Sequence, residues 1–176
     1  MSKKKKITIS KKTIILVLFI ITIGIVLYSA MYFIKSNSLL KYQSDRISFS
    51  YDNSWSVSRL EENIYLTKKN GSSITISIIE KDDEMLNSSI DDINNNVISD
   101  LMDKNENYKK LAEQKMKLTS VYYDGYKTLF ENNTSESLVF VISSSDYVVV
   151  VNYSAKNKYF DMSIDSVESI IGSMVV

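Results

Sequence analysis

The chemistry open to this chain is limited first by two residue types that it lacks. Its 176 residues contain no histidine and no cysteine. Ser-His-Asp and Cys-His catalysis are therefore excluded, as are the usual zinc sites, disulfides and lipid attachment at a cysteine. The four glycines form no phosphate-binding loop, and no Ser-x-x-Lys is accompanied by the other motifs of that enzyme class. We expect a protein that is not an enzyme and needs no cofactor.

Carboxylates are the strongest metal ligands that remain. Asp82, Asp83 and Glu84 are consecutive, and their oxygens could hold a hard cation such as calcium. No EF-hand spacing surrounds them, so a solvated, charged loop is the interpretation that we favour. The pair Asp91 and Asp92 is typical of a helix start.

Tyrosines offer a different kind of site. Tyr122, Tyr123 and Tyr126 lie close together around Gly125, and a tyrosine ring is apolar along its body and polar at its tip. They form a candidate interaction surface. The alternative, which we favour, is that they are half-buried strand residues.

An apolar segment at residues 13–34 carries no charge and follows a basic N-terminus, residues 1–12, which holds six lysines and no acid. As a helix its 22 residues would rise roughly 33 Å, which matches a hydrocarbon core of about 30 Å. Basic residues before the span keep the N-terminus cytoplasmic. We expect a single-pass cell-membrane protein that contacts lipid through residues 13–34 and carries its C-terminal domain outside the cytoplasm.

A cleavable signal peptide and a nucleic-acid-binding segment are two alternatives to this anchor. A cleavable signal peptide has a shorter apolar region of about 7–15 residues and a small-x-small site, whereas here Tyr28 stands where a small residue belongs. The lysines before the span could instead bind nucleic acid, but orientation and contact with anionic lipid explain them more simply. From Ser36 onward, 14 basic and 21 acidic side chains give a net charge of −7, so we expect no nucleic-acid partner.

The sequence after the anchor divides into a polar tether at residues 35–45 and a domain at residues 46–176. Apolar residues alternate from Ile47 to Tyr51, as in a half-buried strand. Asn70-Gly71 predicts a hairpin in which both residues adopt positive φ, so the first third of the domain reads as an antiparallel meander. An apolar stripe from Ile90 to Leu101 predicts a helix.

The second half of the domain predicts four strands and a closing helix. We expect strands over residues 109–118, 126–132, 137–143 and 147–154, with a turn at Asp124-Gly125, and a helix over residues 158–173. Val148 to Val151 run without a polar break, which indicates a strand buried on both faces. The fold class is therefore α+β, with a mainly antiparallel sheet covered by helices on both sides.

The opening of the domain resembles the PsbP-like family, also called Mog/PsbP-like. Phe49-Ser50-Tyr51-Asp52-Asn53-Ser54-Trp55 follows the spacing F-x-[YF]-P-x-x-W of that family, with Asp52 in the place of proline. The later order of elements, with Gly125 at a turn, is also similar. Because the chain has no proline, we expect the side chain of Asp52 or Asn53 to hold the corner through local hydrogen bonds. Trp55 is then a core anchor, or alternatively an exposed platform for stacking a ligand.

The resemblance implies an α/β/α sandwich and a function in binding other proteins. Together with the anchor, it leads us to expect a membrane-anchored, extracytoplasmic, non-enzymatic module that binds a protein partner in the cell envelope. The alternative is a sensor or carrier domain for a small ligand or cation.

Overall fold

Strands dominate the part of the chain that the structure, a computed structural model, describes: residues 39–118 and 123–176. Leu39–Val176 form one unit. The strands are β1 (Leu39–Gln43), β2 (Ser48–Asp52), β3 (Ser56–Leu60), β4 (Asn63–Thr67), β5 (Ser73–Glu80), β6 (Lys109–Leu118), β7 (Tyr123–Glu131), β8 (Ser135–Ser143) and β9 (Tyr147–Lys156). The helices are α2 (Asp83–Asn87), α3 (Ile90–Asp103), α4 (Asn157–Phe160), the 3-10 turn η1 (Asp161–Ser163) and α5 (Ile164–Gly172).

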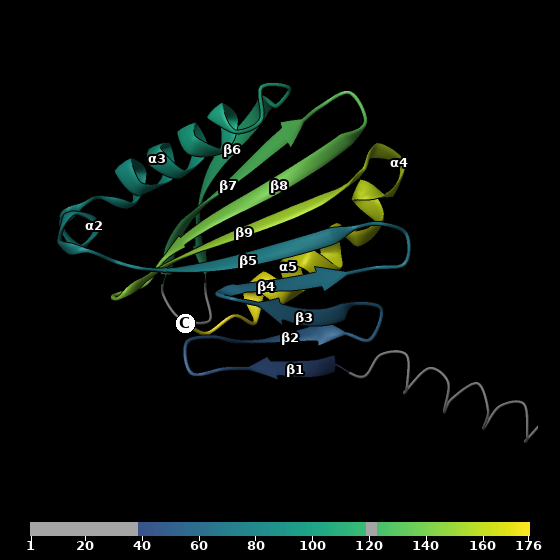
Figure 1. Ribbon diagram of the computed structural model, residues 1–176, viewed down its shortest axis with the longest axis horizontal. Helices are drawn as coiled ribbons and strands as arrows, with labels where there is room; N and C mark the ends of the chain where they lie inside the picture. The colour runs from purple at the N-terminus through teal and green to yellow at the C-terminus, as the bar shows by residue number, and fades with distance from the viewer. Residues whose placement is uncertain (1–38, 119–122) are drawn as a thin grey trace, which may run out of the picture. The chain divides into compact units, whose positions relative to one another are not determined.

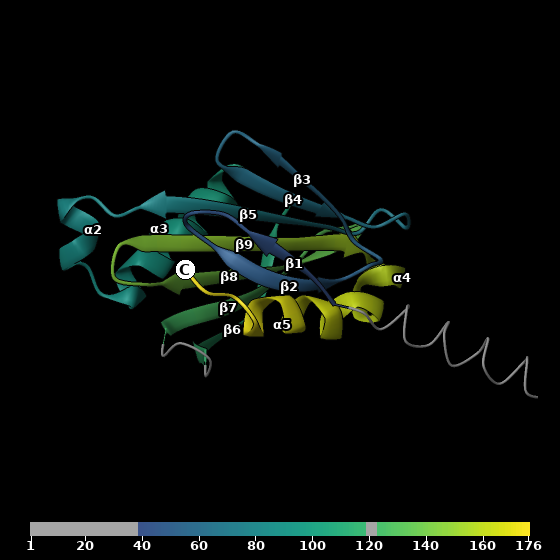
Figure 2. The ribbon, with the colours of Figure 1, turned by 90° about the horizontal axis from the view of Figure 1, so that it is seen from below.

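Seven of these strands form one antiparallel sheet in the order β3-β4-β5-β9-β8-β7-β6. Among the described strands, β1 and β2 pair with each other alone and form a separate two-stranded sheet. Figure 1 shows the large sheet in face view, and Figure 2 shows α5 below the sheet with the β1–β2 hairpin close to it. The predicted mainly antiparallel α+β architecture is confirmed.

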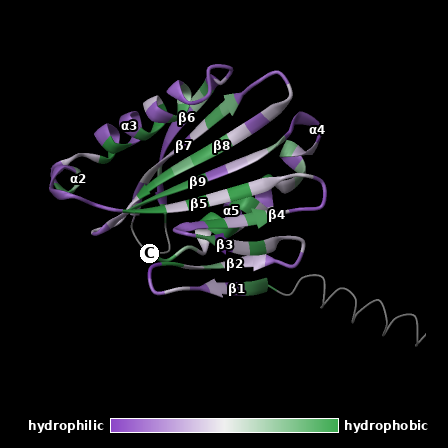
Figure 3. Ribbon diagram, in the orientation of Figure 1, coloured by the Kyte–Doolittle hydropathy of each residue, from purple (hydrophilic) through white to green (hydrophobic). Residues whose placement is uncertain are grey.

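The central strand β9 is covered on both faces, as its run of valines predicts. Val149 and Val151 belong to the larger core, which lies between the sheet and α5, and Val148 belongs to a second core under α3. All three are at most 1% exposed. Figure 3 shows hydrophobic residues concentrated on β8 and β9 and a mostly hydrophilic α3. A continuous apolar strand is therefore explained by two separate packing layers.

The expected sandwich is complete over only half of the sheet. Helix α3 packs on β7 and β8, while on the same face no helix of the described residues lies in front of β3, β4 and β5 (Figure 1). Side chains there, such as Ser58, Tyr65 and Thr75, are polar and partly or fully exposed. The outer strands alternate between buried and exposed residues because only one of their faces is covered.

The N-terminal part of the domain differs from the prediction in two ways. Leu39–Gln43 lie in the expected tether but form β1, so the folded unit begins before residue 46. Strand β2 does not continue into a meander with β3. The sequence does not predict strand β1, because β1 is mostly exposed and has no alternating apolar pattern.

The predicted hairpin at Asn70-Gly71 and the predicted closing helix both form, but each differs in detail from the prediction. The β4–β5 hairpin forms at Asn70-Gly71, but only Gly71 has positive φ (+89°). The Asn70 side chain instead accepts a hydrogen bond from the backbone N–H of Ser72 at 3.0 Å. The predicted closing helix is divided into α4, η1 and α5.

The expected membrane span lies in a part of the chain that the structure does not describe. No helix within residues 39–118 and 123–176 is long and apolar enough to cross a membrane. The expected cytoplasmic N-terminus at residues 1–12 and the expected span at residues 13–34 lie outside the described residues.

Candidate functional site

The corner between β2 and β3 is held by Asp52, as expected for a motif that lacks its proline. Oδ1 of Asp52 accepts hydrogen bonds from the backbone N–H of Ser54 at 2.8 Å and from the Ser54 hydroxyl. Oδ2 accepts one from the Ser166 hydroxyl of α5. The corner is thus tied to the last helix as well as to itself.

Trp55 is a core residue and not an exposed platform. It is 3% exposed, and its indole N–H donates to Oγ of Ser166 at 2.8 Å. Nζ of Lys68 lies 4.4 Å from the centre of the ring, within the range of a cation–π contact. Phe49 is also buried in this core, and Tyr51 packs against it.

Charges around this corner are partly buried. Burial alone would raise the pKa of Asp52, but hydrogen bonds from Ser166 and Ser54 and the charge of Lys68 outweigh it and hold the pKa below its ordinary value. Burial lowers the pKa of Lys68, against the opposing effect of Asp52. These groups serve to close the fold.

The structure separates the tyrosines of the candidate interaction surface. Tyr123 and Tyr126 are three positions apart in β7, so they point to opposite faces of the sheet. The Tyr123 hydroxyl donates to the backbone oxygen of Val176 at 2.6 Å, and the Tyr126 hydroxyl donates to Oδ1 of Asp91 at 2.9 Å. Because Tyr123 and Tyr126 lie on opposite faces, these two side chains form no shared patch. Tyr122 lies outside the described residues.

The predicted turn at Asp124-Gly125 is wrong. Both residues lie inside β7, where Gly125 faces Met116 of β6 and Ile142 of β8. A Cβ at position 125 would lie 2.7 Å from the backbone oxygen of Val141. The glycine marks a close approach of two strands, which a short sequence pattern does not distinguish from a turn.

The acidic run begins a helix that the sequence did not predict. Asp82 is the N-cap of α2, with Oδ1 accepting from the backbone N–H of Met85 at 2.8 Å, and Asp83 and Glu84 occupy the first turn. Residues 39–118 and 123–176 contain no group of three carboxylates that could hold a metal ion. The expected solvated loop is therefore the start of a helix, and the acids there favour its positive end.

A groove, which we call the β6 groove, lies along the edge strand β6. It consists of two adjoining hollows of about 250 and 220 Å³ on the α5 side of the sheet. Both are lined by Gln114 of β6 and Lys127 of β7. Apolar side chains line most of the rest: Ala112, Met116, Leu118, Leu129, Leu138, Phe140, Phe160, Ile164 and Ile171.

One ion pair crosses the β6 groove. Nζ of Lys127 donates to a carboxylate oxygen of Glu168 on α5, and it also lies 5.9 Å from the centre of the Phe140 ring. Lys127 lines both hollows and Glu168 lines one of them, so the pair lies where the two hollows adjoin. Both side chains are partly exposed, so the contact can open at little cost.

Strand β6 itself is a free edge. It pairs with β7 on one side and, among the described strands, has no neighbour on the other. Its first seven residues are all exposed. The sequence did predict this strand, but no pattern in it could reveal that a groove lies beside it, because the groove depends on how α5 is placed.

Comparison with known proteins gives a match at the level of structure. No family model and no curated protein matches the sequence. Cyanobacterial PsbP (CyanoP) from Synechocystis is similar in structure, with a TM-score of 0.60 and 13% identity over 79% of this chain and 92% of that chain. PA94, a Pseudomonas aeruginosa protein of unknown function, gives a TM-score of 0.53 and 8% identity over 80% of this chain and 98% of that chain.

A third solved structure is a protein from Bacteroides thetaiotaomicron, with a TM-score of 0.51 and 12% identity over 77% of this chain but only 47% of that chain. At these identities the likeness concerns the fold and not the activity. It agrees with the strand–corner–tryptophan opening and with the observed order of strands and helices. The described part of this chain, residues 39–118 and 123–176, has the PsbP-like fold.

Proposed function

We propose that this chain is a membrane-anchored, extracytoplasmic and non-enzymatic module that binds a protein partner of the cell envelope along the β6 groove. The observation that carries the proposal is a ten-residue strand with one edge that no described strand pairs and a largely apolar groove beside it. An extended peptide can add to such an edge through backbone hydrogen bonds, and side-chain pockets then supply the specificity.

The side chains of β6 agree with this mode of binding. Residues alternate between the two faces of a strand, and Ala112, Gln114 and Met116 face the groove. Lys115 and Lys117 alternate with them and lie beside Asp91 and Asp124, and Lys117 also borders the groove. A peptide strand beside β6 would place every second side chain over the groove and the others beside these lysines, which favours a partner segment of alternating apolar and acidic residues.

Lysines on an exposed edge also have a purely protective role, since they discourage pairing between edges. The lysines of β6 already have carboxylate neighbours: Lys109 with Glu131 at 3.0 Å and Lys115 with Asp91 at 2.7 Å. Protection alone does not require an apolar groove next to the edge, and the groove therefore favours binding.

Site-specific photocrosslinking in native membranes tests the proposal. A photoreactive residue at Gln114, in the groove, is compared with one at Ser58, which is exposed on β3 at the opposite edge of the sheet. We expect a discrete adduct with one protein from position 114 and none from position 58. The same adducts from both positions, or none from position 114, would contradict the proposal.

The anchor and the side of the membrane need their own test. Protease added to intact spheroplasts should digest the domain, because residues 13–34 are expected to span the membrane with the N-terminus inside. If the domain is digested only after the membrane is broken, its extracytoplasmic location is wrong, whatever the crosslinking experiment gives.

The alternative of a small-ligand sensor or carrier is favoured by a different observation. Both arginines of the chain, Arg46 and Arg59, line one polar pocket away from the β6 groove. A cation carrier has less support, because no carboxylate cluster suited to a metal occurs within residues 39–118 and 123–176.

A further inference from the structure

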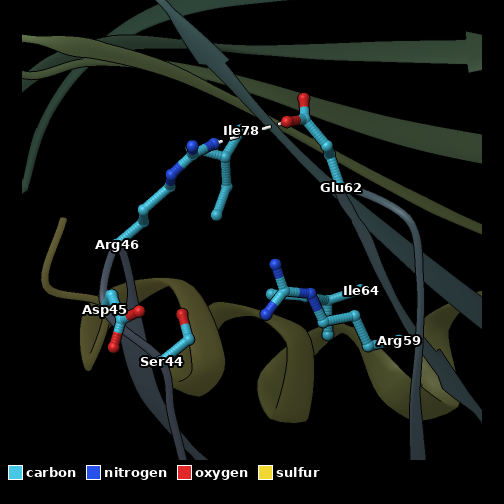
Figure 4. A pocket seen from close by; sticks show the side chains of 7 residues that line it. All are labelled: Ser44, Asp45, Arg46, Arg59, Glu62, Ile64 and Ile78. Carbon is cyan, nitrogen blue, oxygen red and sulfur yellow. Dashed lines mark ion pairs between the residues drawn. The ribbon is translucent and has the colours of Figure 1, made fainter.

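The two arginines of this chain occur in one place. The sequence has 19 lysines but only Arg46 and Arg59 as arginines, and both line a pocket with Ser44, Asp45, Glu62, Ile64 and Ile78 (Figure 4). Arginine differs from lysine in presenting a rigid, planar set of donors that matches a carboxylate. The meeting of both arginines in one pocket therefore points to recognition of a ligand.

Separate parts of the fold build this pocket. Ser44, Asp45 and Arg46 come from the loop between β1 and β2, and Arg59 and Glu62 come from the β3–β4 hairpin. The Ser44 hydroxyl donates to the backbone oxygen of Ile47 at 3.2 Å, which holds the first loop closed. Because one side of the pocket comes from each hairpin, the charges converge only in the folded domain.

The second hairpin fixes Arg59 through an unusual backbone. Glu61 has φ of +55°, and it is the one non-glycine residue with positive φ in the described residues. Its carbonyl oxygen accepts a hydrogen bond from Nε of Arg59 at 3.2 Å. This bond uses the inner nitrogen of the guanidinium and leaves the outer nitrogens directed into the pocket (Figure 4).

The four charges of the pocket are not all paired. Arg46 pairs with Glu62 at 3.5 Å and lies 6.0 Å from the centre of the Tyr147 ring. Within residues 39–118 and 123–176, neither Asp45 nor Arg59 forms an ion pair. Figure 4 shows their side chains on opposite sides of the pocket.

An unpaired cation and an unpaired anion facing one space are complementary to a molecule that carries both charges. A simple anion would be attracted by Arg59 and repelled by Asp45, because the pocket has two acids and two bases. A zwitterion places a carboxylate against the guanidinium and an ammonium against Asp45, and it is attracted at both ends.

The size of the pocket limits the ligand. Its volume is about 170 Å³, below the roughly 300–1,000 Å³ of sites for drug-sized ligands. At about 30 Å³ per water molecule, it has room for five or six waters. Ile64 and Ile78 are 1% and 7% exposed and supply an apolar floor, against which a short hydrocarbon part can lie.

We propose that this pocket binds a small zwitterion of the amino-acid class, with the carboxylate on Arg59 and the ammonium on Asp45. The Arg46–Glu62 pair forms one wall. This site is separate from the β6 groove, and it can be right or wrong independently of the proposed protein binding.

The test compares three ligands of similar size on the full chain in detergent micelles. Alanine carries both charges, propionate lacks the ammonium and ethylamine lacks the carboxylate. Saturation-transfer difference NMR detects weak binding of each, and titration gives its dissociation constant. We expect alanine to bind with a dissociation constant of about 0.1–10 mM, since the charged side chains are largely solvated, and at least about tenfold more tightly than either other ligand.

Charge-neutralising variants assign the effect to the pocket. Arg59→Gln should weaken alanine binding at least about tenfold, as should Asp45→Asn, because each removes a charge-assisted hydrogen bond. The matched controls are Lys69→Gln and Asp103→Asn, which remove an exposed charge elsewhere and should leave binding unchanged. Thermal unfolding of each variant verifies that the fold is retained.

Three results would overturn the proposal. Equal binding of propionate and alanine would indicate a plain anion site. Alanine binding that survives both Arg59→Gln and Asp45→Asn would place the ligand elsewhere. The absence of alanine binding at 50 mM (about five times the weakest expected constant) would mean that these charges are only solvated surface groups.

Discussion

The close approach at Gly125 makes a sharp prediction about stability. A Cβ added there would lie 2.7 Å from the backbone oxygen of Val141. That oxygen belongs to the backbone of β8, which is paired with β7, so it cannot swing aside as the end of a flexible side chain can. Gly125→Ala should therefore force the two strands apart by several tenths of an ångström.

The expected cost follows from overpacking of a well-ordered interior, which is about 1–3 kcal/mol. Gly172→Ala is the matched control, because the same methyl group would meet nothing within 4 Å at the end of α5. Alanine has the higher helix propensity, so this variant should be neutral or more stable by up to about 1 kcal/mol. The same substitution should thus have opposite effects at the two positions.

Urea unfolding of the full chain in detergent micelles measures both effects. Trp55 is the only tryptophan and is buried, so its fluorescence reports the opening of the larger core. With an m-value of about 2 kcal/mol/M, a loss of about 2 kcal/mol lowers the midpoint by about 1 M. A midpoint for Gly125→Ala equal to that of the unmodified chain would refute the close approach of β7 and β8.

Three further predictions concern the hydrogen bonds that close the fold. Ser166→Ala should lower the free energy of unfolding by about 1–3 kcal/mol, since it leaves the indole N–H of Trp55 without its acceptor; Ser169→Ala, on the exposed side of α5, should be neutral by the same urea assay. The lowered pKa of Asp52 means that its ionised form stabilises the fold above its ordinary pKa of 3.8, and that this stabilisation is lost as the pH falls through the lower folded-state value. The acid transition of Asp52→Asn, followed by circular dichroism, should lack that component, and an unchanged acid transition would contradict it. Ser89→Ala removes the N-cap of α3, whose hydroxyl accepts from the backbone N–H of Asp92 at 3.1 Å, and should cost about 1 kcal/mol in thermal unfolding.

Local patterns predicted the elements whose signal is contained in a few neighbouring residues. The Asn70-Gly71 hairpin, the apolar stripe from Ile90 and the valine run at Val148 all formed where expected. Asp91 and Asp92 lie in the first turn of α3, as expected for a helix start. In each case the chemistry of a short segment excludes the other conformations.

Features that depend on distant segments were missed. Strand β1 forms because β2 pairs with it, whereas its own sequence has no alternating apolar pattern that predicts a strand. Gly125 has the composition of a turn but lies inside a strand because Val141 is close.

The arginine pocket was missed for the same reason. Arg46 and Arg59 are 13 positions apart and meet only when the two hairpins are folded. The scarcity of arginine was the one signal that could have drawn attention to them.

The first hairpin of the domain is fastened to its last residues, and this has a consequence for biosynthesis. The backbone N–H of Ser50 donates to Oγ of Ser173 at 2.9 Å across 123 positions, and Ser48 forms a bridge with Val175. Residues 48–50 find these partners only after residues 173–175 have been synthesised. The nascent polypeptide therefore leaves the ribosome with its opening aromatic residues uncovered, and its maturation should depend on factors that hold unfinished chains.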